Sequence, residues 1–163
     1  LFSNTISDNI AFGNPYADSD YVRQMAVVAD ADAFISRMPQ GYETIVGERG
    51  VGLSGGQKQR ISLARALVKD PSILILDDTT SAVDMETESK IQQELAKLTE
   101  AKTTFIIAHR ISSVRDADLI LMMEKGRVVE QGTHEELVSK GGKYYEVYQK
   151  QLGLTGGEAN GTE

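Results

Sequence analysis

The feature that most constrains the fold is a short aliphatic run that ends in two acids. Ile73-Leu74-Ile75-Leu76 stands directly before Asp77 and Asp78. Because successive side chains of a strand point to opposite faces, apolar residues at every position predict a central parallel strand covered by helices on both sides. Open α/β sheets bind ligands at the carboxyl ends of such strands, where two adjacent carboxylates are unfavourable without a cation. We therefore expect a cation there; the alternative is that both acids only cap the following turn.

A second landmark, Leu53-Ser54-Gly55-Gly56-Gln57, lies upstream of this run. Ser54 and Gln57 have the spacing of a capping box and predict the start of a helix, which ends before Pro71. Glycine in a helix costs about 1 kcal/mol relative to alanine, so a pair in the first turn needs a reason. Our hypothesis is that the missing side chains let backbone N–H groups approach an anion at the positive end of the helix dipole. Ser54 and Gln57 would add side-chain hydrogen bonds. The alternative is that the glycines are merely tolerated.

The sequence contains no phosphate-binding loop of the form GxxxxGK[ST]. The segment from Gly47 to Ser54 fits this pattern except at the lysine, where Leu53 stands. The lysine brings positive charge to the β- and γ-phosphates of a nucleotide, and an aliphatic side chain does not replace it. We therefore expect that this chain lacks the loop that cradles a nucleotide. Because its first residue is also not methionine, we expect a fragment of a longer protein.

Helix caps and apolar spacing predict further helices. Short helices are expected to begin at Thr5, at Asp18 and near Asp30 to Asp32. Asp84 is predicted to cap a longer helix that carries Glu88 on its solvent-exposed face. The buried face of that helix is expected to consist of three aliphatic residues, Ile91, Leu95 and Leu98.

Thr103 to Ala108 predicts another strand, and His109 follows it at once. A lone histidine is usually structural. One at the carboxyl end of a strand, beside the strand that ends in Asp77 and Asp78, is a candidate phosphate sensor. We therefore treat His109 as a candidate site residue.

The C-terminal part predicts a hairpin and two helices. Leu119 to Met123 and Arg127 to Glu130 are the expected hairpin strands. Thr133 and Glu136 have the spacing of a second capping box, which places His134 at a helix start, where we expect it on the surface. The tyrosines of the last helix are expected to pack onto the domain; base stacking is the alternative.

Composition narrows the classes of function. The 163 residues are 40% hydrophobic and 25% charged, which is typical of a folded globular unit. A net charge of -7 without a cluster of basic residues argues against nucleic acid as the main partner. The chain has no cysteine, which excludes disulfides and cysteine-bound metals. No stretch reaches the ~18 uninterrupted apolar residues of a membrane-spanning helix.

In this order the motifs resemble those of ABC-type ATPases. Leu53 to Gln57 is similar to the signature motif, Ile73 to Asp78 to the Walker B strand, Ser81 to Asp84 to the D-loop, and His109 to the switch histidine. The resemblance covers nearly the whole chain. It implies an α/β fold: part of a P-loop NTPase (RecA-like) core with a mostly parallel sheet, plus an N-terminal α-helical signature subdomain. The expected division is a helical subdomain at 1–66, a core part at 67–152 and a disordered tail at 153–163.

Further stretches resemble exporters within this family. Leu1 to Ile10 is similar to the segment just after the Q-loop, Thr44 to Gly50 to the exporter X-loop, and Gly132 to Leu137 to the exporter C-terminus. The Walker A loop and the Q-loop glutamine are absent from the sequence. The resemblance implies the ATP-binding and ATP-hydrolysing domain of a membrane exporter, at the cytoplasmic face of the membrane, with a transmembrane domain as partner. The fragment alone is expected to be inactive.

The resemblance also implies how the residues would act. Two such domains would pair head to tail around ATP and Mg²⁺. Four signature residues would contact the ATP of the partner domain: Ser54, Gly55, Gly56 and Gln57. Asp77 would organise Mg²⁺ through water, Asp84 would lie at the dimer junction, and His109 would contact the γ-phosphate in its own site.

One position departs from the family pattern. The general base is usually a glutamate directly after the Walker B aspartate, and this chain has Asp78. Aspartate is one methylene shorter, so the carboxylate falls short of the attacking water. We expect a weak site in one half of a heterodimeric exporter. The alternatives are a homodimer that works with aspartate, a regulatory ATP-binding half that scarcely hydrolyses, and a soluble ABC-type ATPase.

Overall fold

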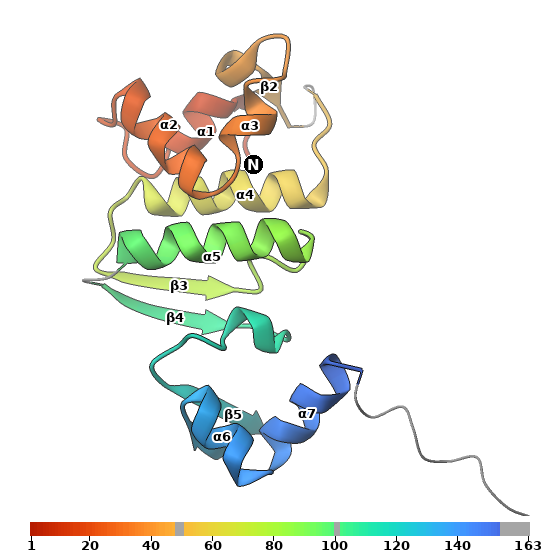
Figure 1. Ribbon diagram of the computed structural model, residues 1–163. Coiled ribbons are helices and arrows are strands. Elements are labelled where there is room, and N and C mark those ends of the chain that lie inside the picture. Colours follow the sequence, from red (N-terminus) through yellow and green to blue (C-terminus); the bar gives the residue numbers. More distant parts are fainter. Residues whose placement is uncertain (48–50, 100–101, 154–163) are drawn as a thin grey trace, which may run out of the picture. The chain divides into compact units, whose positions relative to one another are not determined.

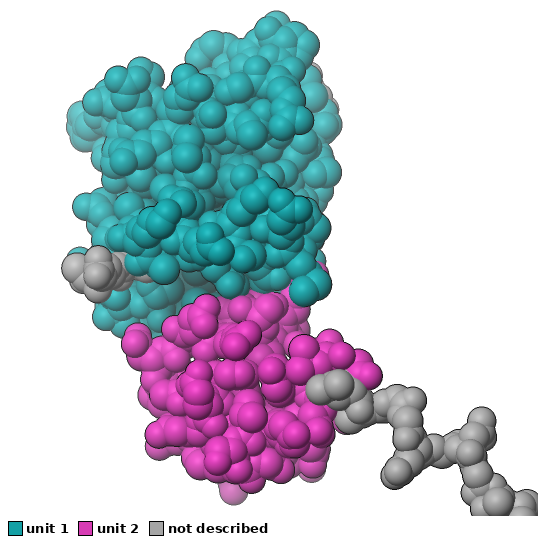
Figure 2. Space-filling view, in the orientation of Figure 1, with its two compact units in different colours: residues 1–107 teal, residues 108–163 magenta. Residues whose placement is uncertain are grey.

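The computed structural model describes residues 1–47, 51–99 and 102–153 (Figure 1). The chain forms two compact units, Leu1–Ile107 and Ala108–Glu163 (Figure 2). The predicted boundary between residues 66 and 67 lies inside the first unit, at the end of its fourth helix, and stays a prediction. Of the predicted tail at 153–163, residues 154–163 lie outside the described residues, as do residues 48–50 at the end of the predicted X-loop.

The first unit begins with the predicted short helices. They are α1 (Ile6–Ala11), α2 (Ser19–Val28) and α3 (Asp32–Ile35). The side chain of Thr5 caps α1 by accepting a hydrogen bond from the N–H of Asp8 at 3.0 Å, and Asp18 caps α2 by accepting from the N–H of Tyr21 at 2.7 Å. Both predicted caps are confirmed, since each needs only a side-chain oxygen ahead of a free backbone N–H group.

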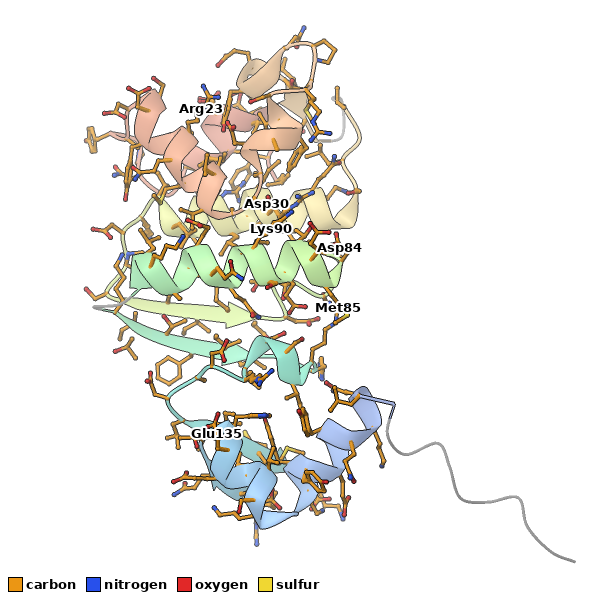
Figure 3. All side chains as sticks on the ribbon, in the orientation of Figure 1. Arg23, Asp30, Asp84, Met85, Lys90 and Glu135 are labelled. Atoms are coloured by element: carbon orange, nitrogen blue, oxygen red, sulfur yellow. The ribbon has the colours of Figure 1, made fainter. Side chains whose placement is uncertain are left out.

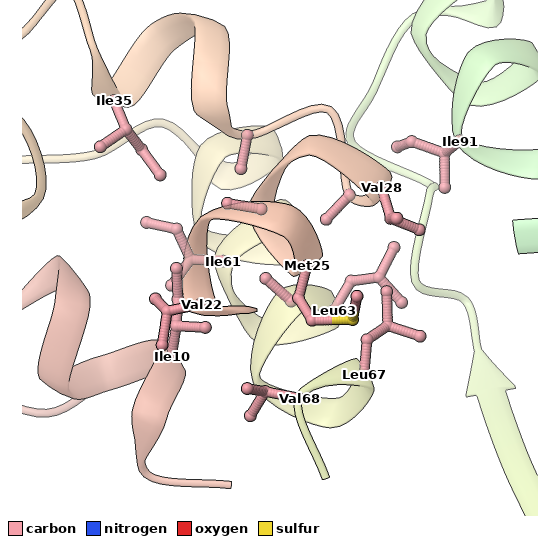
Figure 4. Close-up of a cluster of buried hydrophobic side chains, with 14 of the residues drawn as sticks. Ile10, Val22, Met25, Val28, Ile35, Ile61, Leu63, Leu67, Val68 and Ile91 are labelled. Atoms are coloured by element: carbon pink, nitrogen blue, oxygen red, sulfur yellow. The ribbon is translucent and has the colours of Figure 1, made fainter. Parts of the chain in front are cut away.

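The centre of this unit is α4 (Gly55–Leu67), which packs against α1 and α2. The unit also contains a short antiparallel pair of strands, β1 (Asn4–Thr5) and β2 (Ile45–Val46). In the sequence, β1 precedes α1, whereas β2 follows the 3-10 turn η1 (Gly41–Glu43) and precedes α4. Figure 4 shows apolar side chains of α1, α2 and α3 gathered around those of α4. The members of this core that are at most 2% exposed include Ile10, Val22, Met25, Ile61 and Leu67.

The remaining elements of the first unit are α5 (Met85–Thr99) and a parallel pair of strands, β3 (Ile73–Asp77) and β4 (Thr103–Ile107). In Figure 1, α5 lies along this pair, and its Ile91 and Leu95 join the same core as Leu74 and Leu76 of β3. Alternate residues of β3 therefore point to the helices, as the period of a strand requires.

The expectation that β3 is covered on both faces is wrong for this chain. Ile73 and Ile75 are 60% and 64% exposed, and Phe105 and Ile107 of β4 are 55% and 54% exposed. Among the described residues, no third strand pairs with β3 or β4. The apolar run thus reflects a sheet whose second face is left open here.

The second unit contains the predicted hairpin, β5 (Ile120–Glu124) and β6 (Arg127–Gly132). Lys125 and Gly126 join the strands with φ of 50° and 76°; two positive φ angles match the right-handed twist of the paired strands. The unit also holds the 3-10 turn η2 (Ile111–Ser113) and the helices α6 (His134–Lys140) and α7 (Lys143–Gln151).

The start of α6 confirms one prediction and overturns another. Thr133 and Glu136 form the predicted capping box. His134, however, is only 6% exposed, and its Nδ1 lies 2.8 Å from the hydroxyl oxygen of Tyr144 on α7. The prediction of a surface histidine is wrong because α7 folds back over the first turn of α6. The packing role predicted for the tyrosines is confirmed by Tyr144, which is 2% exposed, and by Tyr148, which packs against the same cluster.

Across the described ranges, no helix is both long and apolar enough to cross a membrane.

Candidate functional site

The first turn of α4 carries the signature-like residues, and its geometry is the predicted capping box. The N–H of Gln57 donates to Ser54 Oγ at 3.2 Å, and the N–H of Ser54 donates to Gln57 Oε1 at 2.9 Å. Ser54 and Gly55 are exposed. The start of the helix is therefore open to solvent at Ser54 and Gly55, at the positive end of the helix dipole, which suits an anion.

Glycine occurs at the two positions of this turn for different reasons. A Cβ on Gly56 would lie 2.7 Å from the carbonyl oxygen of Ala82, so the close approach of the loop after β3 already requires glycine there. A Cβ on Gly55 would meet only the Cβ of Ala82, at an ordinary 3.5 Å. Packing therefore explains glycine at position 56, which was not predicted from the sequence. Packing does not explain Gly55, so the anion hypothesis applies to Gly55.

Gln59, one turn into α4, ties the same loop to the helix. Its Nε2 donates to Ser81 Oγ at 3.1 Å and to the carbonyl oxygen of Asp78 at 3.3 Å, and its Oε1 accepts from the N–H of Ala82 at 3.0 Å. Gln59 was not predicted as a site residue from the sequence. The available signal was its position three residues after Gly56, which places both on one helix face.

Arg60 ties α4 to the opposite side, the turn between α2 and α3. Its Nη1 donates to the carbonyl oxygen and to Oδ2 of Asp30, both at 2.8 Å, and its guanidinium lies 4.8 Å from the ring centroid of Phe34. Asp30 has a φ of 51°, a conformation that aspartate tolerates better than most residues. The start of α4 is therefore fixed between the helical layer and the loop after β3.

Asp77 and Asp78 lie at the carboxyl end of β3, and both are exposed. The N–H of Asp78 donates to the carbonyl oxygen of Ile107 at 3.0 Å, and its own carbonyl oxygen accepts from Ser81 Oγ at 3.1 Å. Asp78 has a φ of 49°, which marks the point where the chain leaves the strand. Its backbone is thus held on both sides, while its carboxylate faces solvent.

The donor set at this strand end fits Mg²⁺ that arrives with a nucleotide. Within the described residues, no group of three or more histidine, cysteine, aspartate or glutamate side chains could hold a metal ion alone. Mg²⁺ is commonly held by one or two carboxylates together with phosphate oxygens and water. Asp77 and Asp78 offer carboxylates of this kind.

Asp84 caps α5, as predicted (Figure 3). Its Oδ1 accepts from the N–H of Thr87 at 2.9 Å, and its Oδ2 accepts from Thr87 Oγ1 at 2.8 Å. The backbone and side-chain hydrogen bonds from Thr87 lower the pKa of Asp84. Both carboxylate oxygens therefore have a structural task within this chain, beside any role at a dimer junction.

Glu88 is not on the exposed face of α5, and that prediction is wrong. It is 2% exposed and its Oε1 accepts from Thr80 Oγ1 at 3.0 Å. Its spacing to Ile91 and Leu95 is that of a single helix face, so the apolar period already placed it inward. Glu88 holds the loop after β3 from the side of α5.

His109 lies in the second unit, two residues after the end of β4, and its ring is exposed. Its carbonyl oxygen accepts from Nε2 of Gln151 on α7 at 2.8 Å, and Oε1 of the same glutamine accepts from the N–H of Ile111 at 2.8 Å. Gln151 was not anticipated from the sequence. The nearness of His109 to Asp77 and Asp78 stays a prediction.

The first unit therefore brings together the signature turn and the loop from Asp77 to Asp84. This loop touches α4 at Gly56 and Gln59. The arrangement offers an exposed helix start at Ser54 and Gly55 for an anion and the exposed residues Asp77 and Asp78 for a cation, on elements joined by these contacts.

Comparisons with known proteins identify the family to which this chain is similar. The profile of the ABC transporter family matches residues 2–81. The chain is 56% identical over 151 residues to the uncharacterized ABC transporter ATP-binding protein YknU of Bacillus subtilis (strain 168), a match that covers 93% of this chain and 26% of that protein. It is 50% identical over 152 residues to an ATP-dependent lipid A-core flippase of Chromohalobacter salexigens, again covering 93% of this chain and 26% of the relative.

A solved structure of a bacterial Atm1-family ABC exporter with ATP bound is similar with a TM-score of 0.88 and 46% sequence identity. The similarity covers 93% of this chain and 27% of the exporter chain, so this chain spans only about a quarter of the length of these three relatives. The fold is thus that of a P-loop NTPase, in agreement with the predicted fold class. The chain belongs to the nucleotide-binding domains of ABC transporters, of the exporter type.

Proposed function

We propose that this chain is the signature and Walker B part of the ATP-binding and ATP-hydrolysing domain of a membrane exporter. The observation that carries the proposal is the joint support of the α4 first turn and the loop from Asp77 to Asp84. Within the parent transporter the domain would lie at the cytoplasmic face of the membrane, with a transmembrane domain as partner and no nucleic acid.

In this function two nucleotide-binding domains pair head to tail. The first turn of α4 and the side chains of Ser54 and Gln57 bind the γ-phosphate of ATP held by the partner domain. The exposed helix start at Ser54 and Gly55 supports this role, because fixed backbone dipoles aimed at a phosphate need no reorganisation during the reaction. Gly55 leaves the turn open on the solvent side.

The same domain serves a second ATP with its own carboxylates. Asp77 holds Mg²⁺ through water, Asp78 orients the attacking water, and His109 contacts the γ-phosphate. Asp84 lies at the junction between the domains, in addition to capping α5. Mg²⁺ neutralises phosphate charge when bound, and most of the catalysis comes from positioning the water in line with the leaving group.

Asp78 is the weak point of this machinery. Its N–H and its carbonyl oxygen are both engaged, so the backbone does not shift forward to compensate for a side chain that is one methylene short. We therefore propose that this domain contributes the weaker of two hydrolytic sites in a heterodimeric exporter. A homodimer that works with aspartate is the alternative.

The test is ATP hydrolysis by the complete transporter that contains this chain. Asp78→Glu should raise turnover at this site, and Asp78→Asn should lower it further. Unchanged single-site hydrolysis in Asp78→Glu would show that the length of the carboxylate is irrelevant. The 163-residue chain alone should show no micromolar affinity for ATP in a titration, because its sequence lacks the phosphate-binding loop.

The aspartate also favours a second candidate function, a regulatory half in which ATP clamps the dimer and is scarcely hydrolysed. A single-turnover assay on the intact pair separates the two. Product formed at both sites would mean that this domain hydrolyses ATP. Product formed at the partner's site alone would mean that this domain is a regulatory ATP-binding half.

A further inference from the structure

We propose that Gln59 is a positioning residue that couples the signature turn of α4 to the loop that carries Asp78. This inference rests on the proposed function, in which Ser54 serves one nucleotide site and Asp78 serves the other. Through Gln59, the binding of a phosphate at one site would set the geometry of the other.

Both the nitrogen and the oxygen of the Gln59 side-chain amide form hydrogen bonds to the loop. Nε2 is the donor to the carbonyl oxygen of Asp78 and to Ser81 Oγ, and Oε1 is the acceptor from the N–H of Ala82. A side chain at this position must therefore donate and accept at once, with this length. Glutamate keeps the acceptor but loses the donor, and methionine keeps the length but loses both.

The packing of Gly56 makes the link stiff. The loop approaches this glycine so closely that a Cβ would lie 2.7 Å from the carbonyl oxygen of Ala82 and 3.3 Å from Cγ1 of Val83. When the first turn of α4 shifts toward the loop, this packing pushes the loop along. When the turn shifts away, the hydrogen bonds of Gln59 pull the loop after it. Packing alone resists approach, whereas hydrogen bonds also resist separation.

The attachment point matters for chemistry. Gln59 bonds the carbonyl oxygen of Asp78, whose N–H is fixed to Ile107 of β4 at 3.0 Å. The carboxylate of Asp78 thus starts from a peptide that is held by the sheet on one side and by α4 on the other. Gln59 touches neither nucleotide in this scheme; it acts through the backbone of Asp78.

The experiment combines two measurements on the same variants. Gln59→Met and Gln59→Glu are compared with the wild type and with Gln93→Met, a matched control. Gln93 is exposed on α5, and its Nε2 donates to Ser89 Oγ at 3.4 Å on the same helix, away from the loop. Amide hydrogen exchange at Ala82 is measured in the 163-residue chain, and steady-state ATP hydrolysis is measured in the complete transporter.

In Gln59→Met, exchange at Ala82 should become about tenfold faster, because the N–H loses its acceptor. The kcat for ATP should fall about tenfold while KM changes by less than about twofold, since positioning and not ATP binding is lost. Gln59→Glu should keep slow exchange at Ala82 yet lose kcat, because the acceptor for the N–H of Ala82 remains while the Nε2 bonds to the Asp78 carbonyl oxygen and to Ser81 Oγ are lost. Gln93→Met should match the wild type in both measurements.

An unchanged exchange rate at Ala82 in Gln59→Met overturns the coupling. So does a fall in thermal stability without any fall in kcat, which would reveal a purely structural residue. If the wild-type transporter hydrolyses no ATP, the proposed function fails, whereas the exchange result still decides whether Gln59 joins helix and loop.

Discussion

Nδ1 of His134 lies 2.8 Å from the hydroxyl oxygen of Tyr144, and both side chains are buried in the second unit. The ring of Tyr148 stands edge-on to the same histidine, with the ring centroids 5.0 Å apart. The two C-terminal helices are thus joined by one polar contact inside an apolar cluster.

Removing this contact should destabilise the second unit. Tyr144→Phe leaves a buried ring nitrogen of His134 without its partner, which should cost about 1–3 kcal/mol. The measurement is chemical unfolding of the 163-residue chain. Tyr16→Phe is the control, because Tyr16 is 97% exposed and should stay near the wild type. Equal unfolding midpoints for both variants would mean that the contact contributes nothing.

Alanine should have opposite effects at the two glycines of the signature turn. Gly56→Ala forces a Cβ against the carbonyl oxygen of Ala82 at 2.7 Å and should cost about 1–3 kcal/mol by overpacking. Gly55→Ala meets only an ordinary contact and should be neutral or stabilising by up to about 1 kcal/mol, because alanine favours the helix. Denaturant midpoints of the two variants decide the matter. A stable Gly56→Ala would show that the loop moves away freely.

Glu130 should make the second unit sensitive to acid. Its carboxylate accepts from the N–H of Tyr144 at 3.0 Å and from the N–H of Lys143 at 2.7 Å, and these bonds, that of Tyr144 first, lower its pKa below the ordinary value of 4.5. The folded state thus holds the proton less tightly than the unfolded state. The stabilisation is complete above the unfolded pKa and is lost as the pH falls through the folded one.

In Glu130→Gln the unfolding free energy should therefore depend less on pH below the ordinary glutamate pKa of 4.5. Tyrosine fluorescence at a series of acid pH values measures this slope. Glu146→Gln, which removes an exposed acid on α7, should keep the wild-type slope. A slope that is the same in Glu130→Gln as in the wild type would assign the acid sensitivity elsewhere.

The open face of the β3–β4 pair should make the chain self-associate. Ile73, Ile75 and Phe105 are more than half exposed on adjacent strands, and apolar sheet surface of this kind is prone to pairing. Sedimentation velocity should show concentration-dependent oligomers of the wild-type chain. Ile75→Lys combined with Phe105→Lys should shift the population to monomers without loss of helical circular dichroism. A wild-type chain that stays monomeric at high concentration contradicts this expectation.

The sequence by itself determined the local elements of this protein. The caps at Thr5, Asp18, Ser54 and Thr133 and the hairpin turn at Lys125 were predictable, because each depends on groups a few residues apart. The family also followed from the sequence, since its motifs are short and lie in a fixed order.

Only the tertiary structure decided which side chains meet across long stretches of sequence. Gly56 and Gln59 meet Ala82, and α7 covers His134, because packing brings together segments that no local period connects. Glu88 was predictable only in part. Its spacing to Ile91 placed it on the buried face of the helix, whereas its charge suggested an exposed position. In the structure it is buried and accepts a hydrogen bond from Thr80. A buried polar group is stable only where it has a hydrogen-bond partner, and the tertiary fold decides where that partner lies.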